Sequence, residues 1–289
     1  MGESAVADFI GRFHVSTLAT DEPVSGRVVL SQRRLVLAAE DGKTTVPLSA
    51  VFDVAAGSVP PELQEFFNDT VTVAYDRGGG REVAVIEGTG ENVDRFRTVL
   101  FKALLHRTTV LVQHPARVGG RVVSSNAERA RVKLSQGTLR FVQCSDPFEV
   151  DLSMVTHVER DERTLGGQTV PVISFKHVVD GQTTTSFVGV NDSRELNILG
   201  RYIRLEYQSV MEELSDVNPT TEEMESLVAI YSAGEGVHLS DLTNVSPAQL
   251  TMVLNSLAED GLVVDGEDAT RLTPKGQALV SRRLEQVNT

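Results

Sequence analysis

The chain has 289 residues and a formal net charge of −13, with 40% hydrophobic and 23% charged residues, which is typical of a globular protein of two or three domains. Because nucleic acids and anionic lipids are polyanions, this charge argues against both as general partners and favours proteins. Arginine (22) far exceeds lysine (5), a balance that also suits a high-salt, halophilic cytoplasm.

The start of the chain and its cysteine content exclude further classes. No apolar run approaches the ~20 residues that a membrane span needs, and the acidic start, with Glu3 and Asp8, is unlike a signal or transit peptide. We therefore expect a cytoplasmic protein with no membrane insertion. The single cysteine, Cys144, excludes an internal disulfide and a cysteine-cluster metal site. Because it falls in a predicted strand, we expect a buried apolar thiol.

An internal repeat organises the first two thirds of the chain. The segment Arg27–Gln32 (Arg-Val-Val-Leu-Ser-Gln) returns at an offset of 104 residues as Arg131–Gln136 (Arg-Val-Lys-Leu-Ser-Gln). The same offset relates two sets of later residues, Val46, Leu48, Ser49, Val51 and Val54 in the first copy and Val150, Leu152, Ser153, Val155 and Val158 in the second. An ungapped match of this length favours one module used twice.

The first module is predicted to combine strands with helices. Four apolar residues near its start are spaced as on one face of a helix: Val6, Phe9, Ile10 and Phe13. They predict a short amphipathic helix over residues 4–13. Alternating apolar residues then predict a meander of hairpins over residues 24–54. The other expected elements are strands at 71–75 and 82–86, a helix after Pro60-Pro61 and a closing helix at about 91–105.

The second module repeats this order. Its expected elements are strands at 109–113, 121–124, 172–178 and 183–190, and a long helix from Asn191 that doubles as a connector. Short strands that curl into a barrel and end in one helix resemble the pleckstrin-homology-like (PH-like) superfold, and we expect both copies to be PH-like β-barrel modules. That superfold hosts many kinds of binding, so the fold alone does not give a ligand.

After residue 219 the pattern changes to helix and turn. The expected elements are helices at 221–233, 239–242 and 246–260, a two-stranded wing at 262–273 and a final helix from Pro274. This order, with Leu-Thr-Pro-Lys-Gly at 272–276, resembles winged-helix domains. The predicted fold class is therefore α+β and multidomain. The three parts are a PH-like module with its N-terminal helix (1–105), a PH-like module with the long connector helix (106–214) and a winged helix-turn-helix domain (215–289).

A winged helix usually reads DNA with its third helix, but residues 246–260 contain no arginine or lysine. The whole segment 215–289 has four basic and twelve acidic residues. Because phosphate contacts supply most of the affinity for DNA, this segment would repel it. We therefore favour docking of a protein over DNA binding.

The middle module concentrates positive charge. Between Arg107 and Cys144 there are seven basic residues and a single acidic one, Glu128. The seven are the candidate partner-binding residues: Arg107, Arg117, Arg121, Arg129, Arg131, Lys133 and Arg140. Three interpretations stay open, namely a solvated strand face whose charges pair within the fold, a docking patch for an acidic protein, and a site for a phosphoinositide-like headgroup.

The sequence offers no catalytic constellation. The segment from Gly88 to Val93 imitates a dinucleotide-binding fingerprint, but Val93 stands where a third glycine is needed, and Glu91 and Asp94 would repel a pyrophosphate. We interpret it as a turn and a helix cap. The six histidines show no metal-ligand spacing, and no Gly-x-Ser-x-Gly elbow occurs. We expect neither an enzyme nor a metal or cofactor site.

The two Arg-Val-x-Leu-Ser-Gln blocks, the Leu-Ser pairs at 48–49 and 152–153 and the opening segment Ala7–Phe13 resemble the archaeal taxis adaptor family CheF. The likeness covers essentially the whole chain. It implies an adaptor between the chemotaxis phosphorelay and the archaellum motor. The implied partners are the response regulator CheY, preferably phosphorylated, CheC/CheD-type proteins and the cytoplasmic ring proteins of the motor.

The resemblance does not say which residues make these contacts. As a hypothesis, the basic patch of the middle module meets an acidic partner such as the response regulator, while another module holds the motor. Two alternatives remain from the residues alone: a winged-helix transcription regulator whose tandem β-modules sense a ligand, and a PH protein recruited to membranes.

Overall fold

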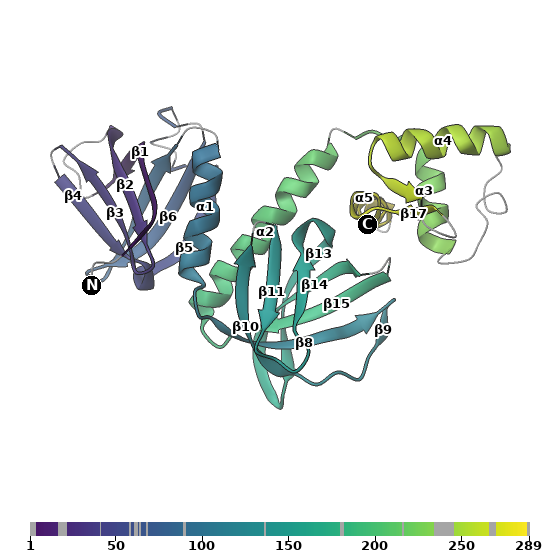
Figure 1. Cartoon of the computed structure of the whole chain (residues 1–289), viewed down its shortest axis with the longest axis horizontal. Helices are drawn as coiled ribbons and strands as arrows, with labels where there is room; N and C mark the ends of the chain where they lie inside the picture. The colour runs from purple at the N-terminus through teal and green to yellow at the C-terminus, as the bar shows by residue number, and fades with distance from the viewer. Residues whose placement is uncertain are drawn as a thin grey trace.

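The computed structural model describes residues 4–16, 22–40, 42–57, 59–60, 63, 65–67, 69–88, 91–135, 137–179, 182–215, 217–233, 246–265 and 270–287. Figure 1 shows two large sheets and a smaller helical part following one another along the long axis of the molecule. Two helices, α1 (Glu91–Leu104) and α2 (Ser193–Ser215), lie between the large sheets.

The first sheet has seven antiparallel strands within the described residues, in the order β4-β3-β2-β1-β7-β6-β5. They are β1 (Ala5–Val15), β2 (Val24–Ser31), β3 (Arg34–Ala39), β4 (Gly42–Pro47), β5 (Val51–Ala56), β6 (Thr70–Arg77) and β7 (Gly80–Glu87). A short 3-10 turn, η1 (Leu48–Ala50), joins β4 to β5. Strand β1 is central, because it pairs with β2 from Ala5 to Phe13 and with β7 from Arg12 to Val15.

The second sheet repeats this order as β12-β11-β10-β8-β15-β14-β13, and an extra short strand, β9, pairs with β8. Its strands are β8 (Thr109–Val118), β9 (Arg121–Val122), β10 (Glu128–Ser135), β11 (Thr138–Val142), β12 (Phe148–Asp151), β13 (Val155–Leu165), β14 (Gln168–Val179) and β15 (Gln182–Gly189). A second 3-10 turn, η3 (Leu152–Met154), takes the place of η1. The two copies of the repeat therefore share their order of paired strands as well as their sequence motif.

The last part contains α3 (Thr221–Ala233), α4 (Pro247–Glu259), the hairpin β16 (Val263–Asp265) and β17 (Thr270–Leu272), and α5 (Pro274–Val287). Helix α5 contacts α3 within this part and also touches β13 and α2. The helix expected at 239–242 lies outside the described residues. None of the helices that the structure describes is long and apolar enough to span a membrane.

One hydrophobic core runs through both large sheets and the two helices between them. Phe96 and Phe101 of α1 and Tyr202 of α2 are at most 1% exposed, and they join core residues of the two sheets in a single cluster. A separate cluster holds the C-terminal part together, with Leu227 and Leu257 fully buried. Burial of this kind supplies about 1.5–3 kcal/mol for each large apolar side chain.

The expected N-terminal helix is wrong, because residues 5–15 form strand β1. Phe9 and Phe13 point to the core, as the alternation of a strand requires, whereas Ile10 is 74% exposed and Val6 is 38% exposed. The helical spacing of the four apolar residues was a coincidence of sequence. Pairing with β2 and β7, which satisfies the backbone of β1, decides the conformation.

Three other expectations differ from the structure. Both large sheets have unpaired ends in their strand order, so neither is the closed barrel that we expected. No regular helix follows Pro60 among the described residues there, where Leu63 N–H donates to Pro60 O at 2.9 Å in a turn. Cys144 lies in a bend after β11 and is partly exposed, rather than buried in a strand. Desolvation and the nearby Glu128 raise the pKa of its thiol.

Candidate interaction surfaces

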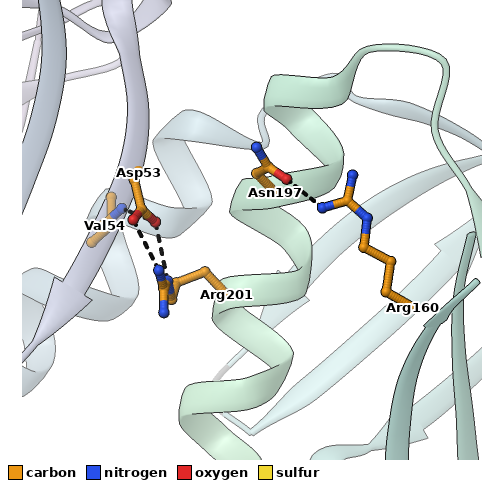
Figure 2. Close-up of polar contacts among 5 residues, drawn as sticks. All are labelled: Asp53, Val54, Arg160, Asn197 and Arg201. Carbon is orange, nitrogen blue, oxygen red and sulfur yellow. Dashed lines mark hydrogen bonds and ion pairs between the residues drawn. The ribbon is translucent and has the colours of Figure 1, made fainter. Parts of the chain in front are cut away.

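Helix α2 follows the second sheet in sequence but is clamped to the first one. Figure 2 shows Arg201 of α2 against Asp53 of β5, with Nε–Oδ1 and Nη2–Oδ2 distances of 3.0 and 2.9 Å. This pairing with Asp53 raises the pKa of Arg201. On the other side of the helix, Arg160 of β13 donates to Asn197 Oδ1 at 2.7 Å. One helix therefore bonds to both sheets.

Two further contacts strengthen this arrangement. The guanidinium of Arg194, in the first turn of α2, donates to the carbonyl oxygens of Leu48 and Val51. The Tyr202 hydroxyl donates to the carbonyl of Ser135 at 3.0 Å, and its ring lies 5.2 Å from that of Phe101 of α1. Desolvation by burial raises the pKa of this tyrosine. The two sheets thus form one platform with surfaces in fixed relation.

The structure brings four of the seven candidate basic residues to one face of the second sheet, and a fifth, Arg107, is exposed in the turn before the neighbouring strand β8. In β10, Ala130 and Val132 face the core, so Arg129, Arg131 and Lys133 lie on the opposite, outer face. Arg140 of β11 is directly opposite Lys133 and shares that face. Arg107 precedes β8, beside Thr108, whose carbonyl accepts from Val132 N–H at 3.2 Å. These five, Arg107, Arg129, Arg131, Lys133 and Arg140, form what we call the basic face.

The other two candidates lie elsewhere. Arg117 and Arg121 flank the hairpin between β8 and β9, where Arg117 pairs with Val122 and Val118 with Arg121. Arg117 is six residues along β8 from Leu111, the partner of Arg129, and six residues of strand span roughly 20 Å. The seven residues therefore do not form a single patch.

Within the described part of the chain, one ion pair neutralises the basic face. Arg140 pairs with Glu149 of β12, with Nε–Oε2 2.8 Å, but the other four make no ion pair with any described residue. Lys133 and Arg140 are like charges directly opposite each other, an arrangement that destabilises a sheet. The Nε of Arg131 is buried and has no hydrogen-bond partner in the described part of the chain. An unsatisfied buried donor costs about 1–3 kcal/mol.

Arg27, which is the equivalent of Arg131 in the first sheet, forms an ion pair within its own module. Arg27 donates through Nε and Nη2 to the two carboxylate oxygens of Asp8, at 2.8 and 2.6 Å. The side-chain hydrogen bond from Arg27 lowers the pKa of Asp8, and the same bond raises the pKa of Arg27. Arg27 is thus neutralised by its own module, whereas Arg131 has no ion pair with any residue that the structure describes.

Sequence reasoning missed a buried polar cluster at one end of the second sheet. His114 Nδ1 lies 2.7 Å and His177 Nε2 2.9 Å from the hydroxyl of Ser186, and His114 stacks on Phe148 with 3.8 Å between ring centroids. Desolvation lowers the pKa of His114, and desolvation and the neighbouring His114 lower that of His177 to about 4. No sequence spacing relates these residues, because three different strands supply them.

This cluster is a structural network, not a catalytic one. Ser186 has no exposed surface and His177 is 1% exposed, so a substrate cannot reach the hydroxyl. One hydroxyl carries one proton, so at least one imidazole must donate to it, which couples the tautomers of the two rings. Among the described residues no group of three or more histidine, cysteine, aspartate or glutamate side chains is placed to hold a metal ion.

Helix α4 offers a different kind of surface. Ser246 caps it with a capping box, in which the Ser246 hydroxyl accepts from Gln249 N–H and the Gln249 side chain accepts from Ser246 N–H. Met252, in the middle of the helix, is 72% exposed. The exposed side of α4 is therefore uncharged at its centre, and phosphates would find no cation on this helix.

Comparison with known proteins identifies the family. The family model described as archaeal chemotaxis signal transduction system protein F matches residues 5–209. The chain is 47% identical over 288 residues to Taxis protein CheF2 of Halobacterium salinarum, and the match covers both chains in full. It is 25% identical over 264 residues to Taxis protein CheF1 of the same organism, covering 90% of this chain and 89% of that protein. The chain belongs to the CheF family of archaeal chemotaxis signal transduction proteins.

Proposed function

We propose that this protein is a non-enzymatic adaptor that couples the chemotaxis phosphorelay to the motor switch of the archaellum. It binds the phosphorylated response regulator CheY and CheC/CheD-type proteins on one surface, and the cytoplasmic ring proteins of the motor on another. The full-length similarity to a named taxis protein is the observation that carries this proposal. All these partners are cytoplasmic, so the proposal places the chain there.

The architecture supports such a role. An adaptor must hold two partners in a defined geometry, and the continuous core and the α2 contacts make the two large sheets one platform. The basic face lies on this platform, while the uncharged side of α4 belongs to a part with its own core. Two different partners require binding surfaces that differ in charge and polarity.

We also infer the fold families behind these surfaces. Each large sheet has the same strand order with a helix packed on it, which supports open PH-like modules at 1–105 and 106–214. The order of three described helices and one hairpin at 217–287 supports a winged helix-turn-helix domain at 215–289. The comparisons give no support to the alternative of a transcription regulator.

The test is reconstitution with purified proteins from the same organism. The chain is immobilised, and binding of the response regulator is measured with and without beryllofluoride, which mimics its phosphorylated state. We expect tighter binding with beryllofluoride, and we expect the motor ring proteins to bind the loaded chain in a ternary complex. Binding of neither protein, or sequence-specific binding of DNA in their place, would overturn the adaptor function.

A further inference from the structure

The two repeats carry different side chains at equivalent positions of their outer faces. In the first sheet, Val29 is opposite Val36, which is opposite Thr45. At the offset of 104 residues, the second sheet has Lys133, Arg140 and Glu149, with the same cross-strand pairing. A largely apolar row in one repeat is thus a charged row in the other. Because the pairing is identical, the difference comes from the side chains and not from the backbone.

Arg27 and Arg131 hold equivalent places in the two repeats, but the residues near them on the neighbouring strand differ in charge. Asp8 is two positions before Ile10, the cross-strand partner of Arg27. Arg107 is two positions before Thr109, the cross-strand partner of Arg131. At the sequence position equivalent to that of Asp8, which neutralises Arg27, the second repeat therefore has another cation, in the turn before β8.

We propose that the basic face is the docking surface for an acidic protein, and that Arg107, standing where the first repeat has Asp8, keeps Arg131 free to pair with a carboxylate of that partner. This inference rests on the adaptor function proposed above and names the chemistry of one of its surfaces. Guanidinium groups suit carboxylates, because they donate two parallel hydrogen bonds to them. In the complex, a carboxylate of the partner pairs with the guanidinium of Arg131, which has no ion pair with the described residues of its own chain.

The charge of the rest of the chain selects a compact partner over an extended polyanion. The net charge is −13, and the segment 215–289 alone has twelve acidic and four basic residues. A nucleic acid or an anionic membrane extends beyond the basic face and meets this negative charge. The acidic surface of a globular protein can contact the basic face alone. Charge complementarity therefore points to a carboxylate-rich protein surface.

The test uses a fluorescently labelled glutamate peptide as the probe, short enough to contact the basic face without reaching the acidic remainder of the chain, with the full chain in dilute salt and anisotropy as the readout. Arg107→Asp should weaken binding of the peptide at least about tenfold, because it removes one cation and gives Arg131 an internal carboxylate. The variant Lys133→Val with Arg140→Val, which copies the first sheet, should weaken it comparably. The matched control is Arg33→Asp, the same change of charge at an exposed position in the turn between β2 and β3. It should change the affinity less than twofold, within the scatter of remote substitutions.

Misfolding of the Arg107→Asp variant is not expected to cause the loss of peptide binding. Arg107 has φ of 70°, in the left-handed region, which aspartate tolerates better than arginine does. The new carboxylate also stands at the sequence position equivalent to that of Asp8. We therefore expect the melting temperature of Arg107→Asp to be no lower than that of the natural chain.

The outcomes separate this inference from the adaptor function. Loss of peptide binding in Arg107→Asp, with binding retained in Arg33→Asp, supports the basic face even if the response regulator and ring proteins fail to bind. Unchanged peptide binding in Arg107→Asp overturns it even if both adaptor partners bind. Tighter binding of vesicles of anionic phospholipid or of duplex DNA than of the peptide, lost in Arg107→Asp, also overturns it, because the face would then serve a polyanion.

Discussion

Arg201 of α2 and Asp53 of β5 are joined by a two-point ion pair although 148 positions separate them in the chain. The helix that ends the second repeat thus bonds to an edge strand of the first. Arg194 adds contacts to two carbonyls at the same edge. Since the buried core is also continuous across α1 and α2, we expect the two repeats to unfold as one cooperative unit.

We expect Arg194→Ala to lower the free energy of unfolding by about 1–3 kcal/mol, because it removes a charged donor from two partly buried carbonyls, of which that of Leu48 keeps only the N–H of Val51. Arg201→Ala should cost about 1 kcal/mol or less, since the Arg201 and Asp53 side chains are 37% and 36% exposed and solvent screens the pair. Urea unfolding followed by circular dichroism measures both changes. Arg204→Ala, at an exposed position of the same helix, is the control. An equal loss of stability in Arg204→Ala would mean that the contacts of Arg194 and Arg201 with the first sheet contribute nothing specific to the free energy of unfolding.

Acidification should destabilise the protein through His177. In the folded chain the pKa of His177 is about 4, against 6.5 as its ordinary value, so between these values only the unfolded chain takes up the proton. The free energy of unfolding is therefore full above about pH 6.5 and falls as the pH decreases towards 4, by about 3 kcal/mol in total. His114, whose pKa is also lowered, acts in the same direction.

The measurement is urea unfolding at several pH values between about 7.5 and 5, above the range where most carboxylates titrate. His177→Asn cannot take up the proton, so its stability should depend less steeply on pH than that of the natural chain. The same substitution at His157, a partly exposed histidine of β13, is the matched control. Equal slopes for the natural chain and His177→Asn would contradict the assignment.

Gly276→Ala should destabilise the C-terminal part. A Cβ built on Gly276 would overlap the carbonyl oxygen of Leu262, so α5 or the backbone before β16 must move. Overpacking of this kind costs about 1–3 kcal/mol. Hydrogen exchange of the amides of α3 and α5 should report the loss, while α1 in the first core stays protected. A variant as stable as the natural chain would show that the close approach is easily relaxed.

Ser246→Ala should weaken α4 by about 1 kcal/mol, because it removes the side chain that accepts from Gln249 N–H at the start of the helix. The expected result is faster amide exchange in the first turn of α4. Ser246→Asp should restore protection, since aspartate is as good a cap and its charge favours the helix N-terminus. Equal exchange in all three chains would contradict a role of the cap in solution.

The sequence predicted much of the fold where local pattern and tertiary structure agree. Alternation and turn residues placed the hairpin of β6 and β7, and the apolar stripes placed α1 and α2. The offset of 104 residues predicted two similar modules, and the strand orders match. The prediction was wrong for β1, because spacing over ten residues cannot tell a strand from a helix when partners far along the chain supply the hydrogen bonds.

The candidate site was predicted only as a list of charges. Composition identified seven cations between Arg107 and Arg140, but it could not divide them, because only strand register tells which side chains share a face. The His114–Ser186–His177 cluster gave no signal at all, since its members come from β8, β15 and β14.

The amino-acid sequence by itself determined the class of this protein: an acidic, twice-repeated β-rich chain with a helical end and a resemblance to CheF. These properties follow from local pattern and composition, which each segment carries alone. The tertiary structure decided which charges are neutralised and which are not. The arginine of the repeated block is ion-paired in one copy and has no ion pair with a described residue in the other, because the strand beside it, β1 in one copy and β8 in the other, does not carry the same residues.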